Sequence, residues 1–236
     1  MKEISEKLNI SVSSVGTDSG TSFAAPQVAG IVASLCSLEP ELLTLMDLTK
    51  AILTCSTLKA SSYMDFELDC NTTDANYRQI GAGIANANNA MELLNNGTYV
   101  SGHISSTENR DAFSIGTLQK GETVTVSLSF LKRTRFADSD HGENATLTDT
   151  PLPDLDVYIV PRVQINVMSF DKNNYTNPSD YTYIFRSISV DNNTEKITFS
   201  AAGTTEYIIV VNKAASSDYH DILYGVAWLK HTSDIH

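Results

Sequence analysis

The spacing of hydrophobic residues changes near residue 98, and this change limits the possible fold more than any other feature of the sequence. Before it, apolar residues recur with the period of an α-helix. After it, they alternate with polar residues, which is the pattern of a β-strand with one buried face. The sequence therefore predicts two domains, residues 1–98 and residues 99–236.

Three helices are predicted in the first domain. The clearest covers residues 23–37, where four apolar side chains share one helix face: Val28, Ile31, Val32 and Leu35. Pro40 blocks its continuation, because proline lacks the backbone N–H that a helix needs. Further helices are expected around residues 46–53 and near residues 85–94, the latter ending at Asn95-Asn96-Gly97.

The second domain shows short strands and no helical pattern. Alternating apolar residues fall into groups: Val124, Val126, Leu128 and Phe130; Leu155, Val157 and Ile159; Ile197 and Phe199. Lys120-Gly121-Glu122 reads as a turn, and residues 136–153 and 172–180 read as long loops. This pattern predicts an all-β domain, an antiparallel β-sandwich or jelly roll.

Composition disfavours two classes of partner. Sixteen Lys and Arg residues against 28 Asp and Glu residues give a formal net charge of −12. Such a charge repels nucleic acid and anionic membrane surfaces, so we expect neither as a partner. No stretch approaches the ~20 apolar residues of a transmembrane helix, so we also expect no membrane span.

The most specific string in the chain is Gly20-Thr21-Ser22-Phe23-Ala24-Ala25-Pro26, followed by Gln27-Val28-Ala29-Gly30. It describes a turn of small residues that delivers a hydroxyl to the N-terminus of a helix, where unpaired N–H groups favour a developing negative charge. Gly20 allows the backbone to approach a substrate closely. Pro26 is expected within about the first turn, where a missing N–H costs little. The simpler alternative is that Ser22 only caps an ordinary helix.

This string resembles the nucleophile motif G-T-S-x-A-x-P of the subtilisin-like serine proteases, the subtilases. The resemblance implies that Ser22 is the catalytic nucleophile, that its own backbone N–H donates to the oxyanion, and that Gly20, Thr21 and Pro26 support the turn. Residues 48–55 and 81–87 resemble later segments of the same catalytic domain, and residues 10–15 resemble the strand before the turn. The likeness covers about residues 9–95, and it implies an α/β remnant of a subtilase catalytic domain.

The other members of a subtilase triad have no counterpart here. In that family Asp and His precede Ser, but only 21 residues precede Ser22 and none is His. Asp18 overlaps the nucleophile turn, and His141 follows the serine within an acidic loop, so neither is assigned. The resemblance therefore implies the C-terminal portion of a serine endopeptidase. Its substrate would be a protein or peptide, its partner the N-terminal part of the catalytic domain, and the isolated chain would be inactive.

The β-rich part carries a second, weaker resemblance. Residues 100–104, 111–115, 154–158 and 206–211 are similar, in that order, to segments of the pre-peptidase C-terminal jelly-roll domains of secreted peptidases. This likeness implies a secreted or cell-surface protein. The alternative interpretation is a non-catalytic β-sandwich that binds or positions other molecules and carries a vestigial protease segment.

No cofactor is required for this chemistry, and no metal ligand is assigned. Calcium is the one cation for which the sequence offers candidate ligands. If two loops converged, hard oxygen ligands would come from Asp154, Asp156 and Asp191, with Asn192 and Asn193. Cys36, Cys55 and Cys70 lack C-x-x-C spacing, which argues against zinc. A disulfide between Cys55 and Cys70 is a further hypothesis, with Cys36 buried and free.

Overall fold

A computed structural model describes residues 21–58, 81–105, 107–131, 153–162, 185–188, 193–214 and 221–231. Within them, eight strands form two four-stranded antiparallel sheets with the orders β1-β8-β3-β6 and β2-β7-β4-β5. The strands are β1 (Tyr99–Ile104), β2 (Arg110–Leu118), β3 (Thr123–Phe130), β4 (Leu155–Pro161), β5 (Phe185–Ser187), β6 (Thr194–Ser200), β7 (Thr205–Lys213) and β8 (Ile222–His231). This is the strand order of a jelly roll, so the prediction of an antiparallel sandwich is confirmed.

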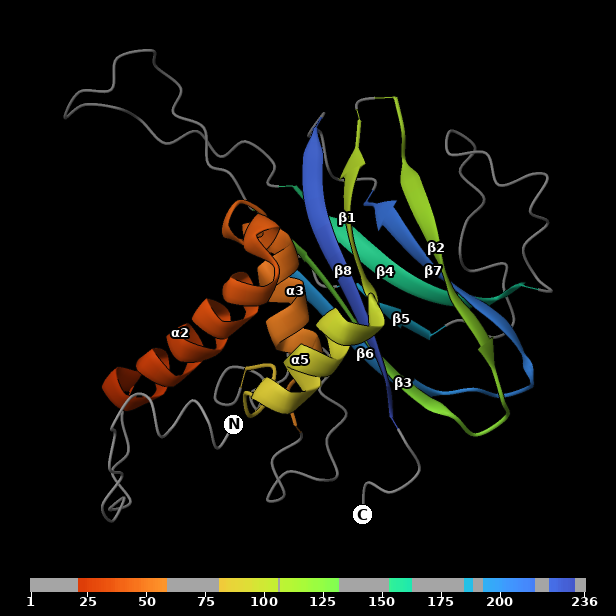
Figure 1. The fold of residues 1–236 in the computed structure, drawn as a ribbon. Coiled ribbons are helices and arrows are strands. Elements are labelled where there is room, and N and C mark those ends of the chain that lie inside the picture. Colours follow the sequence, from red (N-terminus) through yellow and green to blue (C-terminus); the bar gives the residue numbers. More distant parts are fainter. Residues whose placement is uncertain are drawn as a thin grey trace.

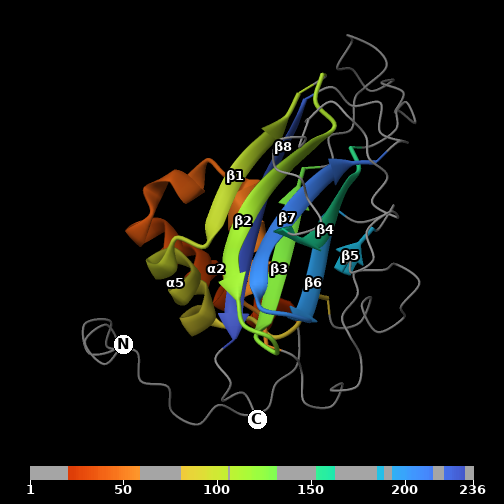
Figure 2. The same ribbon diagram turned by 90° about the vertical axis from the view of Figure 1, so that its right-hand side faces the viewer.

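The sandwich is held together by the apolar residues that alternate along its strands. Val124, Val126, Leu128 and Phe130 are fully buried in one core between the two sheets, as their spacing predicts. Trp228 of β8 packs against the same core and is half-buried. Figure 2 shows the two sheets one behind the other, with β2, β7 and β4 side by side in the sheet that lies away from the helices.

The three predicted helices are present: α2 (Thr21–Leu38), α3 (Met46–Cys55) and α5 (Ala87–Asn96), with a short 3-10 helix, η1 (Pro40–Leu43), after α2. Asn86 caps the N-terminus of α5 by accepting from the Asn89 N–H at 3.1 Å. Gly97 ends α5 at φ +60°, a conformation that favours glycine. No helix in the described ranges is long and apolar enough to cross a membrane.

Asn86→Ala is expected to lower the free energy of unfolding by about 0.5–2 kcal/mol, because the Asn89 N–H then loses its acceptor. Urea unfolding of the chain would measure the change. Asn88→Ala is the matched control, since Asn88 lies exposed in the first turn of the same helix and makes no cap. Equal losses in the two variants would contradict the capping role.

The helices pack on the outer face of the β1-β8-β3-β6 sheet (Figure 1). A second apolar cluster joins Leu35, Ile52 and Leu93 of the helices to Ala227 and Leu229 of β8. Only two residues, Gly97 and Thr98, separate α5 from β1. The predicted boundary at residue 98 therefore falls at a change from helix to strand and not at a linker.

The paired strands are antiparallel throughout the described part of the chain. The structure thus shows a β-sandwich with a few helices, and the subtilase identity of residues 1–98 stays a prediction. The predicted strand at residues 10–15 lies outside the described residues, as do the loop at 172–180 and all but the last residue of the loop at 136–153.

The cysteine hypothesis is wrong in one respect. Cys55 is a free thiol, fully buried where α3 meets the sheet, so it forms no disulfide with Cys70, which lies outside the described residues. Burial raises the pKa of the Cys55 thiol to about 12 and keeps it protonated. Cys36 is buried and free, as expected.

Candidate functional site

Ser22 lies in the first turn of α2, one residue after the helix begins at Thr21. Its side chain is exposed, and no hydrogen bond joins its hydroxyl to another described residue. Gly20 lies outside the described residues. Ser22 therefore lies near the N–H groups at the N-terminus of α2 and is open to solvent, and its catalytic role stays a prediction.

Pro26 lies deeper in the helix than expected. It is the sixth residue of α2. Any other residue at this position would donate its N–H to the carbonyl of Ser22, four residues earlier, and proline has no N–H. The expectation that Pro26 falls within about the first turn needs this correction. Because proline has no N–H, the Ser22 carbonyl lacks the hydrogen bond that the residue four positions later donates in a regular helix.

The N-terminal half of α2 makes little contact with the rest of the described structure. Ala24, Ala25 and Ala29 are exposed, whereas Leu35 and Cys36, near the other end, are buried. Figure 1 shows this half extending away from the sandwich. The half-buried residues of the predicted apolar face therefore have part of their surface in water: Val28, Ile31 and Val32.

The described histidines have partners other than Ser22. His103 on β1 forms an exposed pair with Asp221, with 3.3 Å between Nε2 and Oδ1. His231 at the end of β8 shares a 2.7 Å hydrogen bond with the Thr125 hydroxyl, and burial together with the Lys196 charge lowers its pKa. His141, His220 and His236 lie outside the described residues.

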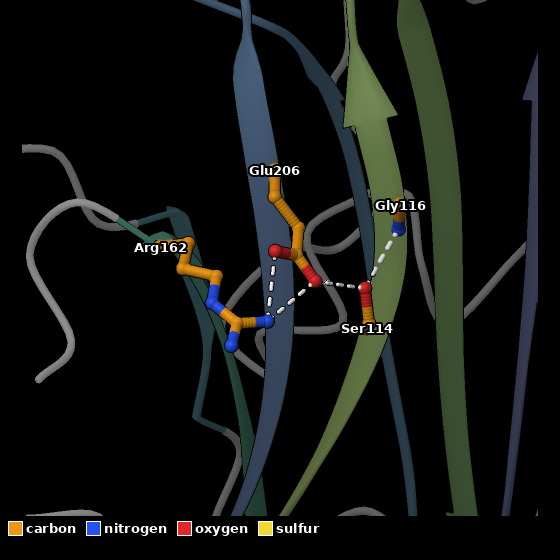
Figure 3. Close-up of polar contacts among 4 residues, drawn as sticks. All are labelled: Ser114, Gly116, Arg162 and Glu206. Atoms are coloured by element: carbon orange, nitrogen blue, oxygen red, sulfur yellow. Dashed lines mark hydrogen bonds and ion pairs between the residues drawn. The ribbon is translucent and has the colours of Figure 1, made fainter. Parts of the chain in front are cut away.

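A polar cluster that the sequence did not predict lies on β2, β7 and the residue after β4 (Figure 3). One guanidinium nitrogen of Arg162 donates to both carboxylate oxygens of Glu206 at 2.8 Å. The Ser114 hydroxyl donates to Glu206 Oε1 at 2.6 Å and accepts from the Gly116 N–H at 3.0 Å. We name these residues the Glu206 cluster: Ser114, Gly116, Arg162 and Glu206.

The Glu206 cluster ties three strands together. The Ser114 hydrogen bond, and then Arg162, hold the pKa of Glu206 below its usual range, so this carboxylate stays charged at neutral pH. The Glu206 cluster lies beside a β-bulge, where the register of β2 against β7 shifts between Ser114 and Gly116. Residues 114, 162 and 206 have no sequence motif in common, so only the strand register reveals the cluster. Its geometry fits a cross-strand bridge and includes no histidine that could act as a base.

The calcium hypothesis gains no site in the described residues. Asp154 precedes β4 and Asp156 is its second residue, whereas the side-chain oxygen of Asn193 accepts from Lys50 Nζ at 2.6 Å, which disfavours a second cation there. No group of three or more His, Cys, Asp or Glu side chains within the described ranges could hold a metal ion. Asp191 and Asn192 lie outside them, so calcium binding stays a prediction.

Asp156 should make stability depend on pH. Burial and the Asp154 charge raise its pKa from 3.8 to about 6, while the Tyr158 hydroxyl, 3.2 Å away, opposes the shift. Because the folded state holds this proton more tightly than the unfolded state, its contribution to stability falls as pH rises from about 4 to about 6. Asp156→Asn is expected to remove that fall.

The variant should therefore be more stable than the parent by about 1–2 kcal/mol near pH 7.5 and equal to it near pH 4. Urea unfolding at the two pH values would measure the difference. An equal difference at both pH values would show that Asp156 acts through packing and not through its charge.

Comparison with known proteins gives structural neighbours only. No protein-family model and no curated protein matches the sequence. The pre-peptidase C-terminal domain of a collagenase from Bacillus anthracis matches 56% of this chain and 88% of its own length, with 12% identity and a TM-score of 0.32.

Two further solved structures match a similar share of the chain. PliG from Aeromonas hydrophila, a periplasmic inhibitor of g-type lysozyme, covers 56% of this chain and 84% of its own length, with 10% identity and a TM-score of 0.34. CorA, a surface-associated copper-binding protein of Methylomicrobium album BG8, covers 58% and 94%, with 12% identity and a TM-score of 0.34. The jelly-roll assignment rests on the strand order itself.

Proposed function

We propose that this chain carries the nucleophile segment of a subtilisin-like serine endopeptidase, with Ser22 as nucleophile, followed by a jelly-roll domain of the pre-peptidase C-terminal type. The observation that carries the proposal is the G-T-S-F-A-A-P string together with the exposed position of Ser22 in the first turn of a helix. The catalytic His and Asp come from residues outside these 236. The protein acts outside the cell or at its surface and requires no cofactor.

In the proposed reaction the Ser22 hydroxyl attacks the carbonyl carbon of a peptide bond. The histidine takes the hydroxyl proton and returns it to the leaving amine, and water then hydrolyses the acyl-enzyme. The contribution of this chain is the nucleophile and the N–H groups at the start of α2. Those groups would stabilise the negative charge that develops on the carbonyl oxygen.

The partly exposed apolar face of α2 supports the proposal that the N-terminal part of a catalytic domain packs on this chain. A helix face that carries Val28, Ile31 and Val32 is normally covered, because burying such side chains stabilises a fold. The N-terminal part of the catalytic domain is the partner we propose for it. A polar helix face at this position would be stable in water and would need no partner.

The first test is the intact mass of the natural protein together with the reading frame upstream of Met1. A mass well above 25.7 kDa, with Asp-Ser/Thr-Gly and His-Gly-Thr segments upstream, is the expected result. The 236-residue chain alone should not hydrolyse peptides, and mixing it with the upstream segment should restore hydrolysis. A natural mass near 25.7 kDa, with no gain of activity on mixing with any encoded segment, would contradict the proposal.

A non-catalytic binding or positioning module is the second candidate. It is favoured by one observation, that no described side chain is hydrogen-bonded to Ser22 while the sandwich has a complete core of its own. In that case the natural protein would show no peptide hydrolysis that depends on Ser22. The intact motif favours the endopeptidase, since a helix cap alone has no need of Gly20, Ser22 and Pro26 together.

A further inference from the structure

The outer face of the β1-β8-β3-β6 sheet is lined with small polar side chains where α3 lies on it. The Thr54 and Ser127 hydroxyls are 2.6 Å apart, and the Cys55 thiol donates to the Thr125 carbonyl at 3.4 Å. Ser127 is fully buried by this contact. The contact is thus specific as well as apolar, because each of these groups has a partner on the opposite element.

Lys196 of β6 ties two loop segments, the one after α3 and the one before α5, to the same face. Its side chain is only 6% exposed, and Nζ donates to Thr57 Oγ1 at 2.5 Å and to the Ala82 carbonyl at 2.9 Å. Thr57 follows the C-terminus of α3, where a helix favours a positive charge. Ala82 belongs to the segment that leads into α5. The buried Lys196 ammonium therefore links the sheet to the segment after α3 and to the segment before α5.

Gly225 of β8 sets how closely α3 approaches. A Cβ atom added there would lie 2.2 Å from Leu48 Cα and 2.5 Å from the Leu48 backbone nitrogen. Both atoms belong to the backbone, which cannot turn aside as a flexible side chain can. The first turn of α3 therefore rests directly on the backbone of β8, and no residue larger than glycine preserves this arrangement.

The helices need this contact in order to be stable. α3 and α5 have ten residues each, and isolated helices of that length are marginal in water. α2 joins the same cluster through Leu35 and Cys36 and packs against η1 and α5. The attachment of the Ser22 helix thus runs through η1 and α5 to α3 and the sheet.

We propose that the outer face of this sheet is the platform on which the helical segment folds, so that the helices and the β-sandwich unfold as one cooperative unit. Gly225 and Lys196 are the main residues of the sheet on which the helical segment docks. The sandwich would then be a structural part of the catalytic domain and not a removable appendage. This last consequence rests on the proposed function; the folding statement does not.

Equilibrium unfolding of the 236-residue chain tests the cooperative unit. Trp228 is the single tryptophan and packs against the sandwich core, so its fluorescence reports the sandwich. Far-ultraviolet circular dichroism reports the helices. We expect the two transitions to coincide in urea. Loss of the helices at lower urea, with the Trp228 signal unchanged, would overturn the proposal.

Gly225→Ala tests the docking contact. It should separate the two transitions and expose Cys55, whose labelling by a thiol reagent is followed by peptide mass spectrometry. A thiol released from burial returns from a pKa of about 12 toward about 8.5, so near pH 8 its thiolate fraction rises about a thousandfold. We therefore expect labelling to rise at least tenfold. Gly203→Ala is the control, because a Cβ there meets nothing within 4 Å.

Lys196→Met is the milder variant in case Gly225→Ala does not fold. It leaves the Thr57 hydroxyl and the Ala82 carbonyl without the ammonium, and it should raise Cys55 labelling several-fold while the Trp228 transition stays near its parental midpoint. Parental labelling rates in both variants would overturn the docking assignment. None of these measurements uses peptide hydrolysis. An inactive natural protein would therefore refute the protease proposal and would not affect the proposal that the helices fold on the sheet.

Discussion

From the proposed function, Ser22→Ala is expected to lower the kcat of the natural protein for peptide hydrolysis by about 10³ to 10⁶-fold, because removing the proposed nucleophile leaves only binding and oxyanion stabilisation. KM should change little, since the hydroxyl contributes to bond making and not to ground-state binding. Hydrolysis of a peptide substrate measures the rate. A serine-directed fluorophosphonate followed by peptide mass spectrometry should label Ser22 in the parent and no residue of the variant.

Ser34→Ala is the matched control. Ser34 lies on the same helix, is exposed, and donates its hydroxyl to the Gly30 carbonyl at 2.9 Å, so its loss changes a helix surface without touching the motif. Its kcat should remain within about twofold of the parent, as expected for a surface substitution. Full activity in Ser22→Ala, or a label on another serine, would assign catalysis to a different site.

Leu128→Ala is expected to lower the free energy of unfolding by about 2–5 kcal/mol. Leu128 of β3 is fully buried between the sheets and lies opposite Val226 of β8 and Glu195 of β6. Truncation removes buried apolar surface and leaves a cavity that the tightly packed sandwich fills only in part. Urea unfolding followed by Trp228 fluorescence would measure the loss.

Leu223→Ala provides the matched comparison for this prediction. The same substitution is made on β8, but the Leu223 side chain is 50% exposed, so little apolar surface is lost and no cavity forms. The expected change is below about 1 kcal/mol. Similar losses at both positions would mean that the inter-sheet core is less well packed than the structure indicates.

Local patterns in the sequence predicted the elements better than their assembly. The apolar alternation of Val124 to Phe130 predicted β3 and the face that packs between the sheets, and the Asn-Gly signal at Asn96 and Gly97 predicted the end of α5. The contact between Leu48 and Gly225 joins residues that are far apart in the chain. No local periodicity encodes such a pairing, so the docking of the helices on the sheet could not be predicted.

The candidate site shows the same division. The string around Ser22 predicted a hydroxyl near a helix N-terminus, because that signal lies within a few consecutive residues. Pro26 was misplaced by less than a turn, since a motif does not fix the residue at which a helix begins. The Glu206 cluster was missed because a bulge in β2 brings Ser114 and Glu206 together, and nothing in the local sequence sets that register.

The bulge in β2 also affects how one molecule meets another. Among the described strands β2 lies at the edge of its sheet, and a regular edge offers a row of backbone groups on which a strand from a second molecule can assemble. Between Ser114 and Gly116 the register of β2 against β7 shifts and Gly116 has a φ of +89°, so the strand is not regular there. The charged pair of Arg162 and Glu206 lies next to this irregular part of the strand. This edge therefore resists the growth of the sheet into aggregates.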